Sequence, residues 1–357
     1  MTETVMARGA RTMEINGADV VIDYGDAEAE VAALRTGAAV MDRSAWSRLQ
    51  LAGRDRLDFI QRMATNDFAR LPTGSGRATV FPDARGRMID HVVVHGWEDE
   101  VVMVGGLGAD KRLAHWLRQY IFFRDQVTVV DMTAATGMLS LYGPQARALA
   151  ETVLGELPRE PYFFAPNGEV AALVAGAAPL GGHGINLIAE EPHLSALWAR
   201  LTAAGARPVG YRAYEALRIA AGYPAYGYEI TEAYNPLEAG LLGAVSFTKG
   251  CYIGQEVVAR LDTYQKLKQH LMGLRFAEAG IAAPGASLQR GMESVGVLTS
   301  FSPLGDQPVG LGYVRAACAE DGATVSVLTT RGRVNATLVA LPGRWTRPYG
   351  FEGEVED

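Results

Sequence analysis

The sequence predicts an α+β protein in which two mixed modules are followed by a small all-β domain. Helices and strands alternate with short connections up to about residue 217, and short strands without helices follow from about residue 270. The chain has 357 residues, which suits two or three modules because domains usually run about 100–150 residues. We place the α+β region at 14–265, with an internal boundary near 137, and the β domain at 270–350.

Three segments of the first module have helical spacing, namely Ala27–Thr36, Arg54–Ala64 and Lys111–Ile121. Strand patterns fall between and after them: Arg48–Leu51, Met88–His95, Val101–Val104, Val127–Asp131 and Gly137–Leu141. The resulting order is helix, strand, helix, strand, strand, helix, strand. This order predicts ferredoxin-like modules instead of a doubly wound sheet. A second set of elements runs from about residue 139 to residue 217, with glycine- and proline-rich turns between them.

The last part of the chain has evenly spaced short strands rich in β-branched residues. They are expected at Leu271–Phe276, Ser294–Ser300, Val309–Tyr313, Thr324–Leu328 and Arg333–Leu341. Such spacing predicts a small barrel or sandwich. We expect the ends of the chain, 1–13 and 352–357, to be disordered.

Composition restricts the classes of partner. The net charge is -7, so the chain as a whole has no electrostatic attraction to nucleic acid or to an anionic membrane, and we expect neither as a direct partner. The sequence contains no run of about 18 apolar residues, so we expect no membrane span. The two cysteines, Cys251 and Cys318, form neither a disulfide framework nor a metal-binding pattern, so we expect no metal site and a cytoplasmic location.

A glycine run at Gly105, Gly106 and Gly108 follows a predicted strand and precedes a predicted helix. It does not fit a dinucleotide loop, because Lys111 occupies the place of the third glycine and no acidic residue follows at the required distance.

A short run from Lys249 to Glu256 is rich in polar and reactive groups. Gly250 and Gly254 bracket Cys251, and Arg260 follows a few residues later. Glycines allow the backbone to approach a ligand, so the run can be a functional site. It can equally be a turn that buries Cys251 as a small apolar side chain.

The motif K-G-C-Y-x-G-Q-E in this run resembles the signature of the YgfZ family, folate-binding relatives of the glycine-cleavage T-protein. The similarity extends from about Val31 to Val314 and includes L-R-I-A-A-G-Y-P from Leu217 and L-G-Y-V from Leu311. The resemblance implies a large folate-binding region, a C-terminal β-barrel and tetrahydrofolate, or a one-carbon derivative of it, as cofactor.

The resemblance implies one of three functions. The first is support of iron–sulfur cluster assembly or repair and of related tRNA modification, with iron–sulfur client or assembly proteins as partners. The second is a folate-dependent one-carbon transferase or demethylase, so the resemblance leaves open whether the protein is an enzyme. The third is folate binding without chemistry.

The resemblance also places candidate folate-binding residues. YgfZ-type proteins flank folate with two tryptophans, and these places hold Trp46, seven residues before Gly53, and Tyr214, eight residues before Gly222. Both aromatic side chains can stack on a pterin, or can simply belong to the core. Arg260 is a candidate for the anionic glutamate tail of folate.

The resemblance places the acid of the T-protein at His91, with the preceding acid kept as Asp90. Alternation puts neighbouring strand residues on opposite faces, so Asp90 can replace the lost acid only if a bulge or register change intervenes. His91 can act as an acid–base group if its pKa stays near neutral, or it is an ordinary strand residue.

Two further charged positions of the T-protein differ in this chain. Its substrate-binding glutamate falls on Asn186, and its substrate arginine falls on Tyr214. We therefore do not expect glycine-cleavage activity. The remaining catalytic candidates are Cys251, as a nucleophile or redox group, and Lys249, which would favour the thiolate; one cysteine cannot hold an iron–sulfur cluster alone.

Overall fold

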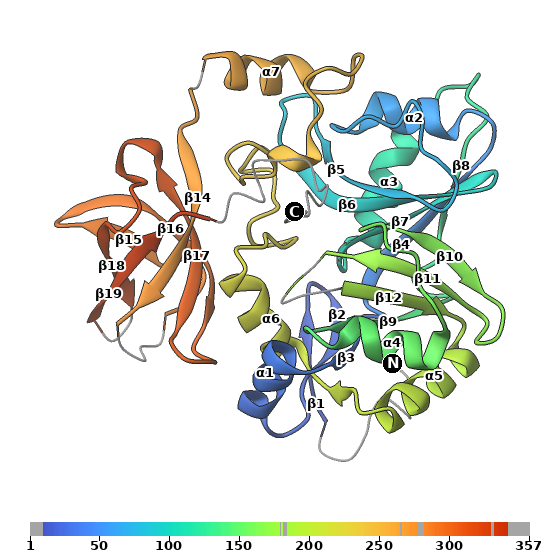
Figure 1. Ribbon diagram of the computed structural model, residues 1–357. Coiled ribbons are helices and arrows are strands. Elements are labelled where there is room, and N and C mark those ends of the chain that lie inside the picture. Colours follow the sequence, from blue (N-terminus) through green and yellow to red (C-terminus); the bar gives the residue numbers. More distant parts are fainter. Residues whose placement is uncertain are drawn as a thin grey trace, which may run out of the picture.

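The computed structural model describes residues 10–178, 180, 184–264, 266–277, 282–329 and 332–341. Two modules, each a sheet with its own helices, pack against each other, and a closed β-barrel lies apart from them, with helix α6 (Tyr211–Ala220) in between (Figure 1). This is the α+β region followed by a C-terminal barrel that the sequence predicted.

The first sheet is antiparallel and has the strand order β5-β6-β7-β4-β8. Along the chain, β4, α2, β6, β7, α3 and β8 form a ferredoxin-like βαββαβ unit, with β5 added at the edge. One face packs under the two helices, where Phe59 and Leu117 meet Leu49 and Val94. The bounds are β4 (Trp46–Ala52), α2 (Arg56–Met63), β5 (Gly76–Pro82), β6 (Met88–Trp97), β7 (Glu100–Leu107), α3 (Asp110–Gln119) and β8 (Thr128–Asp131).

The second sheet has the order β10-β11-β12-β9-β3-β13. It repeats the βαββαβ pattern with β9, α4, β11, β12, α5 and β13, but β3 from the N-terminal part of the chain is inserted between β9 and β13. The bounds are β3 (Ala39–Asp42), β9 (Gly137–Tyr142), α4 (Ala146–Leu154), β10 (Phe164–Asn167), β11 (Ala172–Ala177), β12 (Gly184–Ala189), α5 (Glu191–Ala203) and β13 (Arg207–Pro208).

The faces of the two sheets that carry no helices pack against each other. One core cluster joins Val102, Val104 and Leu107 of the first sheet to Met41 and Tyr142 of the second. The chain therefore changes sheets twice, first between β3 and β4 and again between β8 and β9. The second change, between residues 131 and 137, lies near the predicted internal boundary, whereas β3 belongs to the second sheet although it precedes the first one.

A hairpin of β1 (Arg11–Ile15) and β2 (Ala18–Asp23) precedes helix α1 (Ala27–Thr36). Asn16 and Gly17 form its two-residue turn and both have positive φ, as a tight hairpin turn of the Asn-Gly type requires. Residues 11–13 thus lie in a strand, which corrects the expected disordered leader at these positions. Residues 1–9 and the tail 352–357 lie outside the described residues.

The barrel closes in the order β14-β17-β16-β15-β18-β19, with β19 paired back to β14. The sequence did not predict β15, because its four residues, Ser287–Arg290, are mostly polar. The other bounds are β14 (Gln269–Phe276), β16 (Glu293–Ser302), β17 (Val309–Arg315), β18 (Thr324–Thr329) and β19 (Gly332–Val339).

A buried ion pair joins α6 to the segment that follows it, and hydrogen bonds with Ser300 connect this pair to the barrel. Arg218 of α6 donates to Glu229 over 2.9 Å, and both side chains are fully buried. Ser300 of β16 donates to the same carboxylate over 2.6 Å. Glu229 also accepts a hydrogen bond from the backbone of Ala225, so the network orders the segment that follows α6.

Candidate functional site

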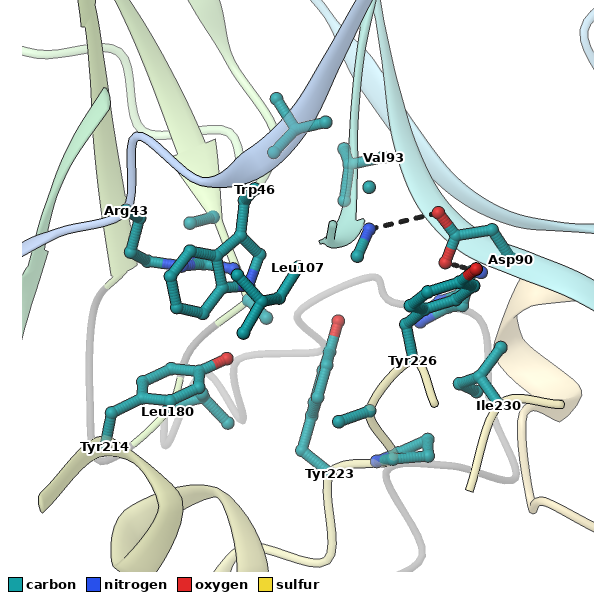
Figure 2. Close-up of a pocket in the computed structure, with 18 of the residues that line it drawn as sticks. Arg43, Trp46, Asp90, Val93, Leu107, Leu180, Tyr214, Tyr223, Tyr226 and Ile230 are labelled. Atoms are coloured by element: carbon teal, nitrogen blue, oxygen red, sulfur yellow. Dashed lines mark hydrogen bonds between the residues drawn. The ribbon is translucent and has the colours of Figure 1, made fainter. Parts of the chain in front are cut away.

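A pocket lies at the seam where the chain crosses from the second sheet to the first. The crossing residues between β3 and β4 include Arg43, and Trp46 opens β4 directly after them. The opposite wall comes from β6, and the segment after α6 closes the pocket with Tyr223 and Tyr226 (Figure 2). The cavity volume in this arrangement is about 80 Å³, which is below the range of about 300–1,000 Å³ usual for small-molecule sites, so a larger ligand would have to displace side chains that line the pocket.

The aromatic side chains predicted to stack on folate both line this pocket. Trp46 and Tyr214 are buried, and their rings meet edge to face with centroids 5.8 Å apart. A flat ligand therefore does not fit between them in this arrangement, but it can lie against the ring faces that border the cavity. Their role in folate binding stays a prediction.

Arg43 is a pocket residue that the sequence analysis missed. Its guanidinium carbon lies 4.4 Å from the ring centroid of Trp46 and 5.3 Å from that of Tyr214. Its Nη1 donates to the hydroxyl of Tyr142 over 2.6 Å. Arg43 thus places a cation beside Tyr214. Tyr214 itself occupies the position that the resemblance assigns to the substrate arginine of the T-protein.

Asp90 reaches the pocket because β6 contains a bulge. The pairing of β5 with β6 runs regularly to Phe81↔Asp90, but the next pair is Pro82↔Met88, so Ile89 is an extra residue. Ile89 packs in the core beneath α2 and α3, whereas Asp90 and His91 both line the pocket. Such a bulge is what Asp90 needs in order to take the place of the T-protein acid, whose position in this chain holds His91.

Two backbone N–H groups hold the Asp90 carboxylate. Gly106 donates to Oδ2 over 3.0 Å, and His91 donates to Oδ1 over 2.8 Å (Figure 2). Burial nevertheless raises the pKa of Asp90 to about 7, because desolvation outweighs these two hydrogen bonds. Asp90 can therefore exchange a proton near neutral pH.

The glycine run singled out in the sequence makes room for this carboxylate. A Cβ atom at Gly105 would lie 2.5 Å from Oδ2 of Asp90, and one at Gly106 would lie 2.3 Å from Cβ of Tyr226. The two glycines thus serve the pocket by lacking side chains.

His91 differs from its expected chemistry. Burial lowers the pKa of His91 to about 4, so the expectation of a value near neutral does not hold. Its imidazole is neutral at pH 7, and its buried Nε2 has no hydrogen-bond partner among the described residues. His91 can donate or accept one hydrogen bond from a ligand, but Asp90 is the group that titrates near neutrality.

Asn186 of β12 also lines the pocket. Its Oδ1 accepts a hydrogen bond from Ser140 over 2.6 Å, which leaves its amide nitrogen as a donor for a ligand. The structure therefore brings together five predicted residues: Trp46, Asp90, His91, Asn186 and Tyr214.

The other three predicted residues lie elsewhere, since none of the described residues that line the pocket comes from 249–260. Lys249 is buried and donates to the carbonyls of Gln61, Ala64 and Asn66, at the end of α2. Cys251 is exposed, and Arg260 lies on α7 (Gln255–Tyr264). Lys249 thus supports the end of α2, and any functional role of Lys249, Cys251 or Arg260 stays a prediction.

The sequence alone did not indicate Arg43 or the tyrosines of the closing segment, and it gave the glycine pair no role in a pocket. Tyr223 belongs to the stretch L-R-I-A-A-G-Y-P, which carried the family resemblance without giving this tyrosine a role, and Tyr226 follows two residues after that stretch. Arg43 had a weak signal, a single cation between the apolar run before Asp42 and the strand at Trp46.

Among the described residues, no group of three or more histidine, cysteine, aspartate or glutamate side chains is placed to hold a metal ion. The helices in the described ranges are also too short or too polar to cross a bilayer.

The fold and the pocket define a protein with two α+β modules, a barrel and a ligand site at the seam of the two sheets. Residues 1–249 match the family model of the GCVT N-terminal domain, and residues 269–343 match that of the glycine cleavage T-protein C-terminal barrel domain. The chain belongs to the glycine cleavage T-protein family.

Curated relatives cover nearly the whole chain. A putative chloroplastic transferase of Arabidopsis thaliana is 32% identical over 91% of this chain and 76% of its own length. An aminomethyltransferase of Geobacillus kaustophilus is 31% identical over 95% of this chain and 96% of its own length. The crystal structure of a glycine cleavage system aminomethyltransferase T from Bartonella henselae has the same fold, with a TM-score of 0.86 at 21% identity over 98% of each chain.

Proposed function

We propose that the pocket binds tetrahydrofolate and that the protein is a folate-dependent one-carbon transferase in which Asp90 carries the proton. The observation that supports this most strongly is a buried carboxyl group, with a pKa of about 7, in a pocket that also has aromatic walls. A protein that only bound folate would not need a titrating carboxyl group in its pocket. The geometry therefore favours the transferase over the iron–sulfur support role.

The described residues fit a reduced folate chemically. Trp46 and Tyr214 offer ring faces for a pterin. The amide nitrogen of Asn186 and the unpartnered Nε2 of His91 offer polar contacts for its amide edge. Tetrahydrofolate would supply a nitrogen that accepts or releases a one-carbon unit. Asp90 would take the proton from that nitrogen when it accepts the unit, and return it in the reverse direction.

The experiment is calorimetric titration of tetrahydrofolate into the wild-type protein and into Asp90→Asn, at pH values from 5.5 to about 8.5, spanning the shifted pKa. We expect both proteins to bind, and only the wild-type affinity to depend on pH around 7. Asp58→Asn, which changes an exposed carboxylate of α2, is the control. Binding to wild-type protein that does not change with pH would remove Asp90 from the proposed role, and no binding at all would contradict the folate site.

A second candidate function is the YgfZ-type role in the cytoplasm, support of iron–sulfur proteins and tRNA modification. The observation that favours it is the exposed Cys251 in K-G-C-Y-I-G-Q-E, outside the pocket. On this reading, tetrahydrofolate binds in the pocket and Cys251 contacts a client protein.

Timed labelling of the native protein with a thiol reagent, followed by mass spectrometry, tests this candidate. Cys251 is exposed and Cys318 is only partly so, so Cys251 should label first if its segment is reactive. Cys251→Ala should then remove the iron–sulfur phenotype and leave folate affinity unchanged. Equal or slower labelling of Cys251 would count against the role, with Cys318→Ala as the matched control.

A further inference from the structure

Three arginines are buried among the described residues of the α+β region, and one of them differs from the other two. Arg48 is fully buried and donates to the carbonyl oxygens of Trp46 and Thr133, among others. Arg218 is fully buried and pairs with the carboxylates of Glu215 and Glu229. Both guanidinium groups are therefore satisfied by the protein itself.

Arg43 lacks such partners. Its side chain is only 8% exposed, yet its one hydrogen bond is to the neutral hydroxyl of Tyr142. Its Nε is buried and has no hydrogen-bond partner, and no carboxylate of the described residues forms an ion pair with it. The remaining contacts are the ring faces of Trp46 and Tyr214.

This arrangement is unfavourable unless something completes it. An arginine stays charged at any physiological pH, and a buried charge without a counter-ion is destabilising. Contacts with ring faces offset only part of that cost, since each is worth about 0.5–2 kcal/mol. The guanidinium borders the cavity, so a ligand in the pocket is the group that can supply the missing charge.

We propose that Arg43 binds a carboxylate group in the pocket. The identity of the biological ligand that carries this carboxylate rests on the proposed function. A guanidinium presents its N–H groups in a planar fork that matches the two oxygens of a carboxylate. Nε and Nη2 are the donors left free by the contact of Nη1 with Tyr142. The carboxylate comes either from the benzoylglutamate part of folate or from a second, small substrate.

The alternative is a purely structural role, in which Arg43 only fills the space between two aromatic rings. The two roles differ in measurable ways. A structural arginine would respond to the shape of its replacement and not to the charge of the ligand. A carboxylate site would discriminate between a ligand and its uncharged amide, whatever the effect of a substitution on stability.

Two measurements test the proposal. The first is calorimetric titration of tetrahydrofolate and of tetrahydropterin, which lacks the benzoylglutamate, into wild-type protein, Arg43→Gln and Arg43→Lys. The second is a nitrogen-15 NMR titration of the Arg43 Nε–H signal, assigned by its absence in Arg43→Gln. Glycine and acetate are added in turn, and glycinamide and acetamide are their uncharged counterparts. Arg212→Gln, on the exposed side of α6, is the control variant.

Either of two results supports the proposal. If folate supplies the carboxylate, Arg43→Gln should weaken tetrahydrofolate binding by at least about 30-fold, the usual effect of removing one partner of a buried charge pair. Tetrahydropterin binding should then stay unchanged. If a small substrate supplies it, glycine or acetate should shift the Nε–H signal of the wild-type protein to saturation, and the amides should not.

Equal tetrahydrofolate affinity in wild type and Arg43→Gln, together with no response of the signal to any carboxylate, would overturn the proposal while leaving the folate site intact. Failure of wild-type protein to bind tetrahydrofolate would contradict the proposed function instead, and the NMR arm would still decide the role of Arg43. That arm uses unmodified protein, so it holds even if Arg43→Gln does not fold.

Discussion

Asp90 owes its position to the residue before it. The extra residue Ile89 packs in the core beneath α2 and α3, at the place that Asp90 would take in a regular strand. Asp90 therefore faces the pocket together with His91. A sequence pattern of alternating faces cannot show a bulge, because one inserted residue exchanges the faces of all residues beyond it. The sequence could therefore name Asp90 and His91 as candidates but could not choose between them.

The raised pKa of Asp90 predicts a dependence of stability on pH. Burial raises this pKa from 3.8 to about 7, so the folded protein holds the proton more tightly than the unfolded chain does. The stabilising contribution of the protonated carboxyl is complete below pH 3.8 and is lost as pH rises to about 7. Asp90→Asn should remove this decline. Urea unfolding of both proteins at several pH values measures it, and parallel stability curves would contradict the shifted pKa.

Gly106 sets the width of the pocket opposite Asp90. A methyl group at Gly106 would lie 2.3 Å from Cβ of Tyr226, so Gly106→Ala must displace the wall of the pocket. We expect folate affinity to fall about tenfold, which corresponds to about 1.4 kcal/mol of binding free energy, because the displaced Tyr226 narrows the pocket. Gly168→Ala is the matched control, because nothing lies within 4 Å of the added carbon. Calorimetry on both variants measures the difference; equal affinities would mean that the ligand does not use this wall.

Trp46 and Tyr214 are the aromatic walls that the family spacing predicted. Stacking on one ring is worth about 0.5–1.5 kcal/mol beyond the buried area, so Trp46→Ala should weaken folate binding by about threefold to tenfold. Calorimetry with unchanged affinity in both Trp46→Ala and Tyr214→Ala would exclude these rings from the site.

At the scale of elements, the crossing from β3 to β4 creates the site. The sequence located α1, α2 and α3 and most of the long strands, because their apolar spacing is local information. It did not show that β3 joins the second sheet, since pairing between Val40 and Leu141 depends on contacts about a hundred residues apart. The crossing brings Arg43 to the seam between the sheets. This location depends on how the strands pair, so the local sequence could not predict it.

The buried ion pair between Arg218 of α6 and Glu229 orders the segment that closes the pocket. Glu229→Gln would leave Arg218 with a weaker partner, and removing one member of a buried pair costs about 3–5 kcal/mol. We expect urea unfolding to show a loss of this size. Asp306→Asn, which breaks an exposed pair with Arg35, should cost about 0–1 kcal/mol. Similar losses in the two variants would contradict the stabilising role of the buried pair.

At the scale of the whole molecule, the family and the three-part architecture follow from motifs that run along most of the chain, so sequence could predict them. Which reaction the molecule performs depends on a few pocket positions. Asn186 and Tyr214 replace two charged residues of the T-protein, so we still expect little methylene-tetrahydrofolate from the aminomethyl group of a lipoyl carrier protein. A purified-protein assay with robust formation of that product would refute this expectation.

In the proposed function, the seam between the two sheets holds tetrahydrofolate with a proton carrier beside its reacting nitrogen. The most direct test is a crystal structure of the protein with tetrahydrofolate bound. On this proposal we expect the pterin in the pocket against Trp46 or Tyr214, with N5 within hydrogen-bond reach of Asp90, directly or through one water. Folate bound at another place, or with N5 facing only aromatic side chains, would contradict it.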